Sequence, residues 1–212
     1  MGSRSRIVLP PAYLGSVSYY VCLLNFPTEI EQFANYSRQT YFNRCRIASA
    51  NGVMDLTIPV ENPTQKTWVR DIRISNHGNW QMCHWRAIEA AYFSSPFFEF
   101  YQDDFRPFYT KKYRFLFDFN RELQKTVLNI IDLPYQITYT ENYEKNLPEG
   151  VIDFREMMHP KKNNVTLQDY FKLKPYYQVF EQKHGFLSDL SIIDLLFNMG
   201  TEARLILKNN IK

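Results

Sequence analysis

The chain of 212 residues has a formal net charge of +3, with 45% hydrophobic and 22% charged residues, a balance typical of a globular protein. Glycine is scarce at 7 residues, and the spacing of these glycines excludes the glycine-rich loops that hold nucleotide phosphates and the nucleophile elbow of hydrolases. Basic residues alternate with acidic ones along the chain, which argues against nucleic acid as a partner.

The cysteines and the hydrophobic runs indicate where the protein works. Cys22, Cys45 and Cys83 are odd in number and far apart, so we expect no disulfide scaffold. The N-terminal residues lack the apolar segment of a signal peptide, and no run approaches the length of a membrane span. We therefore expect a cytoplasmic protein without a membrane span.

The first part of the chain has the pattern of a βαβ unit. Residues 6–10 form a short apolar run that Pro10 and Pro11 end, which predicts a buried strand. Residues 16–24 place apolar side chains at helical spacing, and residues 29–34 alternate as a second strand does.

The middle of the chain predicts a hairpin, one further strand and two helices. Residues 43–60 form two strand-like runs around Asn51-Gly52, a strong hairpin signal. Residues 68–75 alternate between apolar and charged residues, which predicts a strand with one wet face. Apolar stripes predict helices over residues 80–93, with Asn79 as N-cap, and over residues 113–131.

The last part of the chain is harder to interpret. Residues 136–140 resemble a strand, and residues 141–174 form a long polar connection. Ser191 and Asp194 have the spacing of a capping box for a helix that Gly200 ends, and a last helix begins near Thr201.

These elements predict one domain over residues 1–212 of the α/β class. Its sheet is opened by the βαβ unit and continued by the antiparallel hairpin on the same sheet, with helices packed around it. The alternative architecture is α+β, with the helices on one face.

Two buried polar positions are candidates for chemistry. His84 lies in line with Trp80, Ile88 and Tyr92 on the apolar face of its helix. It is either a hydrogen-bonded core residue or a general base at a pocket wall. Asn120 poses the same choice, because a buried amide either ties two elements together or faces a substrate.

The segment from Gln39 to Arg46 concentrates hydrogen-bonding groups. Arg44 and Arg46 lie two residues apart on a predicted strand, so their side chains share a face and can bind a carboxylate or a phosphate of a ligand. The alternative is that they form salt bridges with Asp55 or Asp71 on the surface of the sheet. Cys45 is a nucleophile only if a base such as His84 lies nearby.

Metal sites have weak support in the sequence. Cys83 and His84 are neighbours on a helix and point apart, and adjacent Asp103 and Asp104 are more typical of an N-cap and a surface charge. We therefore expect no metal site, and no cofactor is indicated.

Several segments taken together resemble the WbqC-like protein family over nearly the whole chain. These segments are Pro11-Ala12-Tyr13-Leu14-Gly15, Gln39-Thr40-Tyr41-Phe42-Asn43-Arg44-Cys45, Leu56-Thr57-Ile58-Pro59-Val60, Trp80 with His84-Trp85, Ile88 and Tyr92, Ser95-Pro96-Phe97-Phe98 with Asp103-Asp104, and residues 190–198. The resemblance implies a cytoplasmic bacterial protein, and some members are encoded among genes for surface-polysaccharide (O-antigen) biosynthesis.

The resemblance and the polar segment together suggest a transferase-type enzyme acting on an activated sugar or related precursor. The expected partner is therefore a small-molecule substrate such as a nucleotide sugar. In this hypothesis His84 takes a proton, Arg44 and Arg46 hold an anionic group, and Asn43 and Gln39 orient the acceptor. Tyr13 and Asn120 line the same pocket. The alternative is a non-catalytic binding or scaffold protein of a polysaccharide-assembly system, which predicts an exposed apolar patch instead of a deep pocket.

Overall fold

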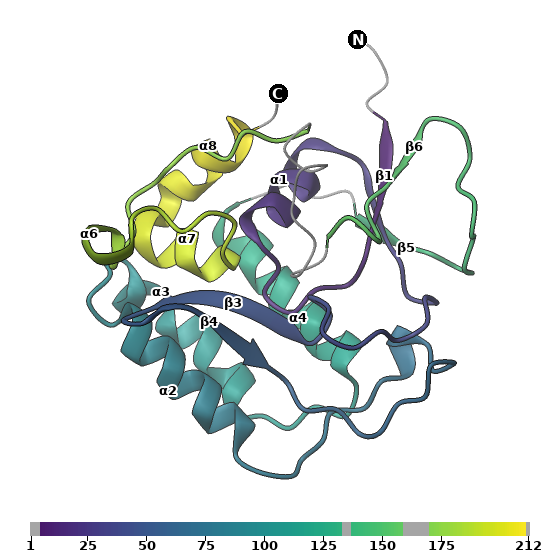
Figure 1. The fold of residues 1–212 in the computed structure, drawn as a ribbon, viewed down its shortest axis with the longest axis horizontal. Coiled ribbons are helices and arrows are strands. Elements are labelled where there is room, and N and C mark those ends of the chain that lie inside the picture. The colour runs from purple at the N-terminus through teal and green to yellow at the C-terminus, as the bar shows by residue number, and fades with distance from the viewer. Residues whose placement is uncertain (1–4, 133–136, 159–169, 211–212) are drawn as a thin grey trace.

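The computed structural model describes residues 5–132, 137–158 and 170–210 (Figure 1). No helix among these residues is long and apolar enough to cross a membrane. In chain order the elements are β1 (Arg6–Leu9), α1 (Val17–Asn25), β2 (Thr28–Ile30), β3 (Arg44–Ser49), β4 (Gly52–Thr57), η1 (Val69–Asp71), α2 (Trp80–Tyr92), α3 (Phe98–Phe105), η2 (Arg106–Tyr109), α4 (Leu116–Ile130), β5 (Ile137–Tyr139), β6 (Val151–Asp153), α6 (Glu181–His184), α7 (Ile192–Met199), η3 (Gly200–Glu202) and α8 (Ala203–Lys208).

A four-stranded parallel sheet has the order β5-β2-β1-β6. Strand β1, helix α1 and strand β2 form the predicted βαβ unit, with Ile7 opposite Thr28 and Leu9 opposite Ile30. The unit forms because the two prolines after β1 end the strand and the apolar stripe of the next residues folds back as a helix. Strand β6 lies within the stretch that the sequence predicts to be a connection. It was not predicted, because three residues are too few to show the alternation of a strand.

The hairpin forms at its predicted place but not in the predicted sheet. Strands β3 and β4 pair antiparallel, with Cys45 opposite Leu56, and make a separate two-stranded sheet. The expectation of one continuous sheet is therefore wrong in this respect. The buried side chains of β3, Cys45 and Ile47, pack in the core beside α2 and α7 instead of extending the parallel sheet. Helices packed with parallel and antiparallel strands fit the predicted α/β class and equally the α+β alternative.

The two faces of the parallel sheet differ in chemistry. Ile7, Leu9 and Ile30 belong to the hydrophobic core, on the face where α1 and α4 pack. The alternate positions point the other way, and on that face Arg6 pairs with Glu29 at 3.5 Å. Among the described residues, the loop between β5 and β6 covers this polar face, and Figure 1 shows the helices on the other side of the strands. The one-sided arrangement is the feature that the α+β alternative predicted.

The alternating pattern of residues 68–75 does not produce a strand. Residues Val69–Asp71 form a 3-10 helix, and Arg73 and Ile74 make only isolated bridges, to Phe115 and Val60. The alternation still places Ile72 and Ile74 in the core. The predicted strand is therefore wrong, although the side-chain burial that it implied is present.

The long helices match their apolar stripes. Helix α2 begins after Asn79 as predicted, without a hydrogen bond from the Asn79 side chain, and α4 carries its stripe into the core. The predicted capping box before α7 is wrong. The Ser191 hydroxyl donates to the carbonyl oxygen of Leu14, so it does not cap the helix.

Asp194 is fully buried, and its side chain forms hydrogen bonds to other core residues instead of capping the helix. Its carboxylate accepts hydrogen bonds from the hydroxyls of Tyr92 and Tyr176 and from the side-chain amide of Gln178, at 2.7 to 2.9 Å. These bonds tie α2, α7 and the segment before α6 together.

We expect Asp194→Asn to destabilise the protein by about 3 kcal/mol, because the amide that replaces one carboxylate oxygen cannot accept and leaves at least one buried donor unpaired, while the remaining bonds lose their charge assistance. The measurement is urea unfolding followed by tryptophan fluorescence. The control is Asp118→Asn, whose exposed carboxylate pairs with Arg121 one helical turn away and should contribute less than about 0.5 kcal/mol. Equal effects of the two substitutions would contradict the account.

Candidate functional site

Tyr13 and His84 lie together in a buried hydrogen-bond chain. The Tyr13 hydroxyl is 3.0 Å from Nδ1 of His84 and 2.8 Å from the Tyr109 hydroxyl, and Nε2 of His84 is 3.2 Å from the carbonyl oxygen of Thr57. The Thr57 oxygen can only accept, so Nε2 carries the proton and Nδ1 accepts from Tyr13. Every polar atom of the imidazole is thus occupied by the protein itself.

The environment holds His84 neutral. Burial lowers its pKa to about 4, although the hydrogen bond to Thr57 acts in the opposite direction. The side chain is 6% exposed and lines none of the cavities formed by the described residues that are discussed below. The role of His84 as a base therefore stays a prediction that the geometry does not support.

Cys45 lies in the same part of the core. Burial raises the pKa of its thiol far above the usual range, and the charge of Asp55 raises it further. The thiolate needed for nucleophilic attack is therefore disfavoured at Cys45.

The side chains of the two buried asparagines form hydrogen bonds to backbone carbonyl groups. The Asn43 amide donates to the carbonyl oxygen of Ile58, and the Asn120 amide donates from α4 to the carbonyl oxygen of Phe42. Their Oδ1 atoms have no hydrogen-bond partner among the described residues. Asn120 lines a cavity of only about 10 Å³, which is room for one water molecule and not for a substrate.

The arginines predicted to bind an anion are engaged elsewhere. Arg44 pairs with Asp55 at 3.0 Å and donates from Nε to Thr57, which is the salt-bridged arrangement that the sequence allowed as an alternative. Arg46 lies near Tyr41 and Asp189. Gln39 is an exposed turn residue with a φ of 62°.

The predicted site residues therefore do not gather in one cleft. Tyr13 and His84 meet inside the core, whereas Arg44 lies on the hairpin and Gln39 on a turn. The Asp103-Asp104 pair is exposed on α3, and no group of three metal-ligating side chains occurs among the described residues.

A cavity of about 310 Å³ opens where the parallel strands end. Its wall contains the residues that follow the carboxyl ends of three strands: Pro10 after β1, Glu31 after β2, and Arg155 after β6. In open α/β sheets, ligands bind outside the carboxyl ends of the strands, and this volume suits a small molecule. The full lining is Pro10, Pro11, Glu31, Ala34, Asn35, Ser37, Thr40, Tyr41, Phe42, Val69, Tyr143, Lys145, Asp153, Arg155, Glu156 and Met158.

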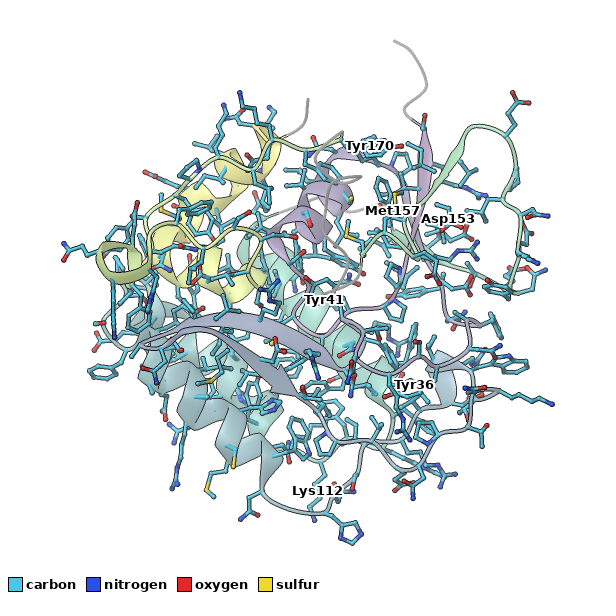
Figure 2. The ribbon with its side chains drawn as sticks, in the orientation of Figure 1. Tyr36, Tyr41, Lys112, Asp153, Met157 and Tyr170 are labelled. Carbon is cyan, nitrogen blue, oxygen red and sulfur yellow. The ribbon has the colours of Figure 1, made fainter. Side chains whose placement is uncertain are left out.

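Figure 2 labels two residues of the cavity wall, Tyr41 and Asp153. Tyr41 precedes the hairpin, in the middle of the molecule, and Asp153 ends strand β6. Burial and the charge of Asp189 raise the pKa of Tyr41 to about 12, so its hydroxyl stays protonated near neutral pH. The wall thus combines carboxylates, cations, hydroxyls and the aromatic rings of Tyr41 and Tyr143, groups that bind a polar molecule with hydroxyls and a flat or charged part.

Arg155 organises the wall of the cavity. Its guanidinium donates to both carboxylate oxygens of Asp153, at 3.0 and 2.7 Å, and from Nη1 to Glu31 at 3.0 Å. Nη1 also donates to the carbonyl oxygen of Glu144, and the group lies 4.9 Å from the ring centre of Tyr143. One side chain therefore joins the ends of β2 and β6 to the loop that follows β5.

The charges in this cluster stabilise one another. Burial acts to raise the pKa of Asp153, but the hydrogen bonds and charge of Arg155 outweigh it and hold that pKa below its usual range. Glu31 is 1% exposed and uses its second oxygen to accept from the backbone of Phe33 and the hydroxyl of Thr140. Both carboxylates are therefore engaged by hydrogen bonds to Arg155 and are poorly placed to act as bases.

The N-terminus of α1 is occupied by the chain itself. In dinucleotide-binding folds the first helix after the first strand holds a phosphate at this end. Here the carboxylate of Asp189 accepts from the backbone N–H of Ser18 at 2.9 Å and from its hydroxyl at 3.0 Å. A ligand phosphate is thus excluded from this helix end, in agreement with the absence of a glycine-rich loop.

Sequence reasoning missed Glu31, Asp153 and Arg155. These residues are far apart in the chain, and a charged residue after a strand has no special pattern by itself. A usable signal was present for β2, because the polar residue that follows a buried parallel strand lies at the edge where ligands bind. No such signal marked β6.

Comparison with known proteins identifies relatives. The model of the WbqC-like protein family matches residues 30–162. A protein of Mycobacterium tuberculosis described as "Uncharacterized protein Rv1507c" is 25% identical over 193 residues, covering 79% of this chain and 81% of its own length. No solved structure matches the chain significantly.

Because His84 is buried with a lowered pKa, we expect the free energy of unfolding to depend on pH. Its pKa is about 4 in the folded protein and about 6.5 when unfolded, so the unfolded chain binds more protons between these values. The neutral imidazole then contributes about 3 kcal/mol of stability above pH 6.5, which is lost as the pH falls towards 4. Urea unfolding of wild type and His84→Gln at several pH values measures the difference.

The control for this experiment is His77→Gln, because His77 is exposed. This variant should keep the wild-type slope, whereas His84→Gln should lose the part of the slope that lies between pH 6.5 and 4. A wild-type slope in His84→Gln would show that His84 is not buried as a neutral group.

Arg155→Met should destabilise the protein by about 3 kcal/mol, because it leaves the buried Glu31 carboxylate without its counter-charge. Thermal and urea unfolding measure the change. Arg204→Met is the matched control, since Arg204 pairs with the exposed Asp132 and should change stability by less than about 0.5 kcal/mol. A near-neutral Arg155→Met would contradict the role assigned to this side chain.

Proposed function

Because the chain belongs to the WbqC-like protein family, we propose that it is a transferase-type enzyme acting on an activated sugar or a related precursor of bacterial surface polysaccharides. The cavity at the carboxyl ends of the parallel strands carries this proposal. Its volume of about 310 Å³ is in the range of small-molecule sites, and residues of several loops converge on it. The polysaccharide context comes from the family resemblance, and the binding place comes from the geometry.

The lining of the cavity suits a sugar-like substrate. Thr40, Tyr41 and Asn35 present hydroxyl and amide groups that bind sugar hydroxyls, and Tyr143 presents a ring on which a sugar or nucleobase stacks. The wall also carries charged side chains of both signs, which suits the charged group of an activated precursor. The proposed substrate site thus differs from the cluster predicted around His84 and Arg44, although Tyr41 belongs to the segment from Gln39 to Arg46.

We expect at least one member of a panel of nucleotide sugars, acyl donors and amino acids to raise the melting temperature of the wild-type protein, because a ligand that binds only the folded state stabilises it. Ser37→Trp fills the cavity from an exposed lining position and should abolish the shift. Ser94→Trp, at an exposed position outside the cavity lining, should keep it. A shift that survives in Ser37→Trp would place the ligand elsewhere.

The second candidate function is a non-catalytic binding or scaffold protein of a polysaccharide-assembly system. Two exposed aromatic side chains favour it, Phe93 at 70% and Phe100 at 82% exposure. Absence of a shift across the whole panel would contradict the transferase proposal and favour the scaffold.

A further inference from the structure

We infer that Lys145 is the residue that binds the anionic group of the substrate, a phosphate, diphosphate or carboxylate. The inference rests on the proposed function, since only an activated precursor must carry such a group. It assigns the anion to the loop between β5 and β6, which lies in the long polar connection but contains none of the residues predicted to bind a substrate.

The first step is that the arginine in the cavity wall is already neutralised. Arg155 is joined to the carboxylates of Asp153 and Glu31 by three hydrogen bonds at 2.7 to 3.0 Å. Its side chain is 7% exposed. An incoming anion would have to displace a buried carboxylate from Arg155, which is strongly unfavourable because a buried carboxylate needs its partner.

The second step is that the other expected anion sites are occupied. The N-terminus of α1 is filled by the carboxylate of Asp189, and Arg46 lies near that same carboxylate. Arg44 pairs with Asp55 on the hairpin and does not line the cavity.

The third step is that Lys145 remains. It lines the cavity, it is exposed, and it forms no ion pair among the residues that the structure describes. A lysine ammonium is a mobile point charge on a long stem, and lysine binds phosphate in many nucleotide sites. Among the cations that line the cavity, it is the one whose charge is available.

The position of Lys145 in the loop makes this contact specific. The neighbouring Glu144 is held by its carbonyl oxygen to Arg155 at 2.9 Å, and the Tyr143 ring lies against the same guanidinium. The backbone next to Lys145 is therefore fixed at the cavity wall while its side chain is free to reach a ligand. The carboxylates of Asp153 and Glu31 face Arg155, and the third carboxylate of the lining, Glu156, follows β6, so the anion should bind beside Lys145 in the loop.

The test uses inorganic pyrophosphate as the probe and two-dimensional NMR of the full chain. In the wild type, pyrophosphate should shift the amide signals of residues 141–150 saturably. Lys145→Gln should raise the dissociation constant about tenfold, the loss expected for one charged hydrogen bond, and Lys145→Arg should restore it. Lys112→Gln is the control, because Lys112 is exposed and lies at the far edge of the molecule in Figure 2.

Binding that depends on Lys145, is kept in Lys112→Gln and weakens as salt is raised supports the inference. The inference is overturned if pyrophosphate moves none of these signals, or if Lys145→Gln binds it as the wild type does. The two proposals can be contradicted separately. If a nucleotide sugar binds the cavity equally well in Lys145→Gln, the role of Lys145 is wrong but the proposed function stands. If pyrophosphate binds through Lys145 but no member of the ligand panel shifts the melting temperature, the anion site stands but the proposed function is wrong.

Discussion

The need to compensate buried charge at the ends of the parallel strands shapes this molecule more than any other constraint. Glu31 is almost completely buried, and an ionised carboxylate in that environment is tolerated only with a close partner. Arg155 supplies the partner from the segment that follows strand β6, 124 residues later in the chain. Because its remaining donors hold Asp153 and the carbonyl oxygen of Glu144, the same residue fixes the loop that closes the cavity.

The scarcity of glycine acquires a structural meaning in this arrangement. The chain opens with a βαβ unit, and Asp189 lies at the helix end where nucleotide-binding folds with such a unit bind phosphate. Asp189 has a φ of 55°, a left-handed conformation that aspartate tolerates better than most residues. The N-terminus of α1 is therefore paired with a carboxylate of the chain itself. Any ligand anion must use side chains, and the loop carrying Lys145 is where we place it.

The sequence predicted those elements whose signal is local and periodic. The stripes of α2 and α4 and the Asn51-Gly52 turn each needed only neighbouring residues, and they appear as expected. The strand at residues 68–75 failed because alternation fixes which side chains are buried, not whether the backbone pairs. The capping box failed because Asp194 gains more from three donors in the core than from the end of a helix.

The candidate site was less predictable than the fold. His84 was expected on the apolar face of its helix, and it is there, but no pattern tells a core imidazole from one that lines a pocket. Arg44 and Asp55 pair across the hairpin, so the cluster of polar residues was a real feature with a structural use. Glu31, Asp153 and Arg155 meet only through the order of the parallel strands, and that order cannot be derived from strands of three residues.

The most direct test of where this protein binds its ligand is backbone amide chemical-shift mapping with whichever member of the ligand panel stabilises the protein most. The account predicts that the largest perturbations fall on residues 31–42, 143–145 and 153–158, which come from the loops at the carboxyl ends of the parallel strands. Perturbations centred on the hairpin at residues 44–57 and on α2 around His84, with the carboxyl-end loops unchanged, would contradict it.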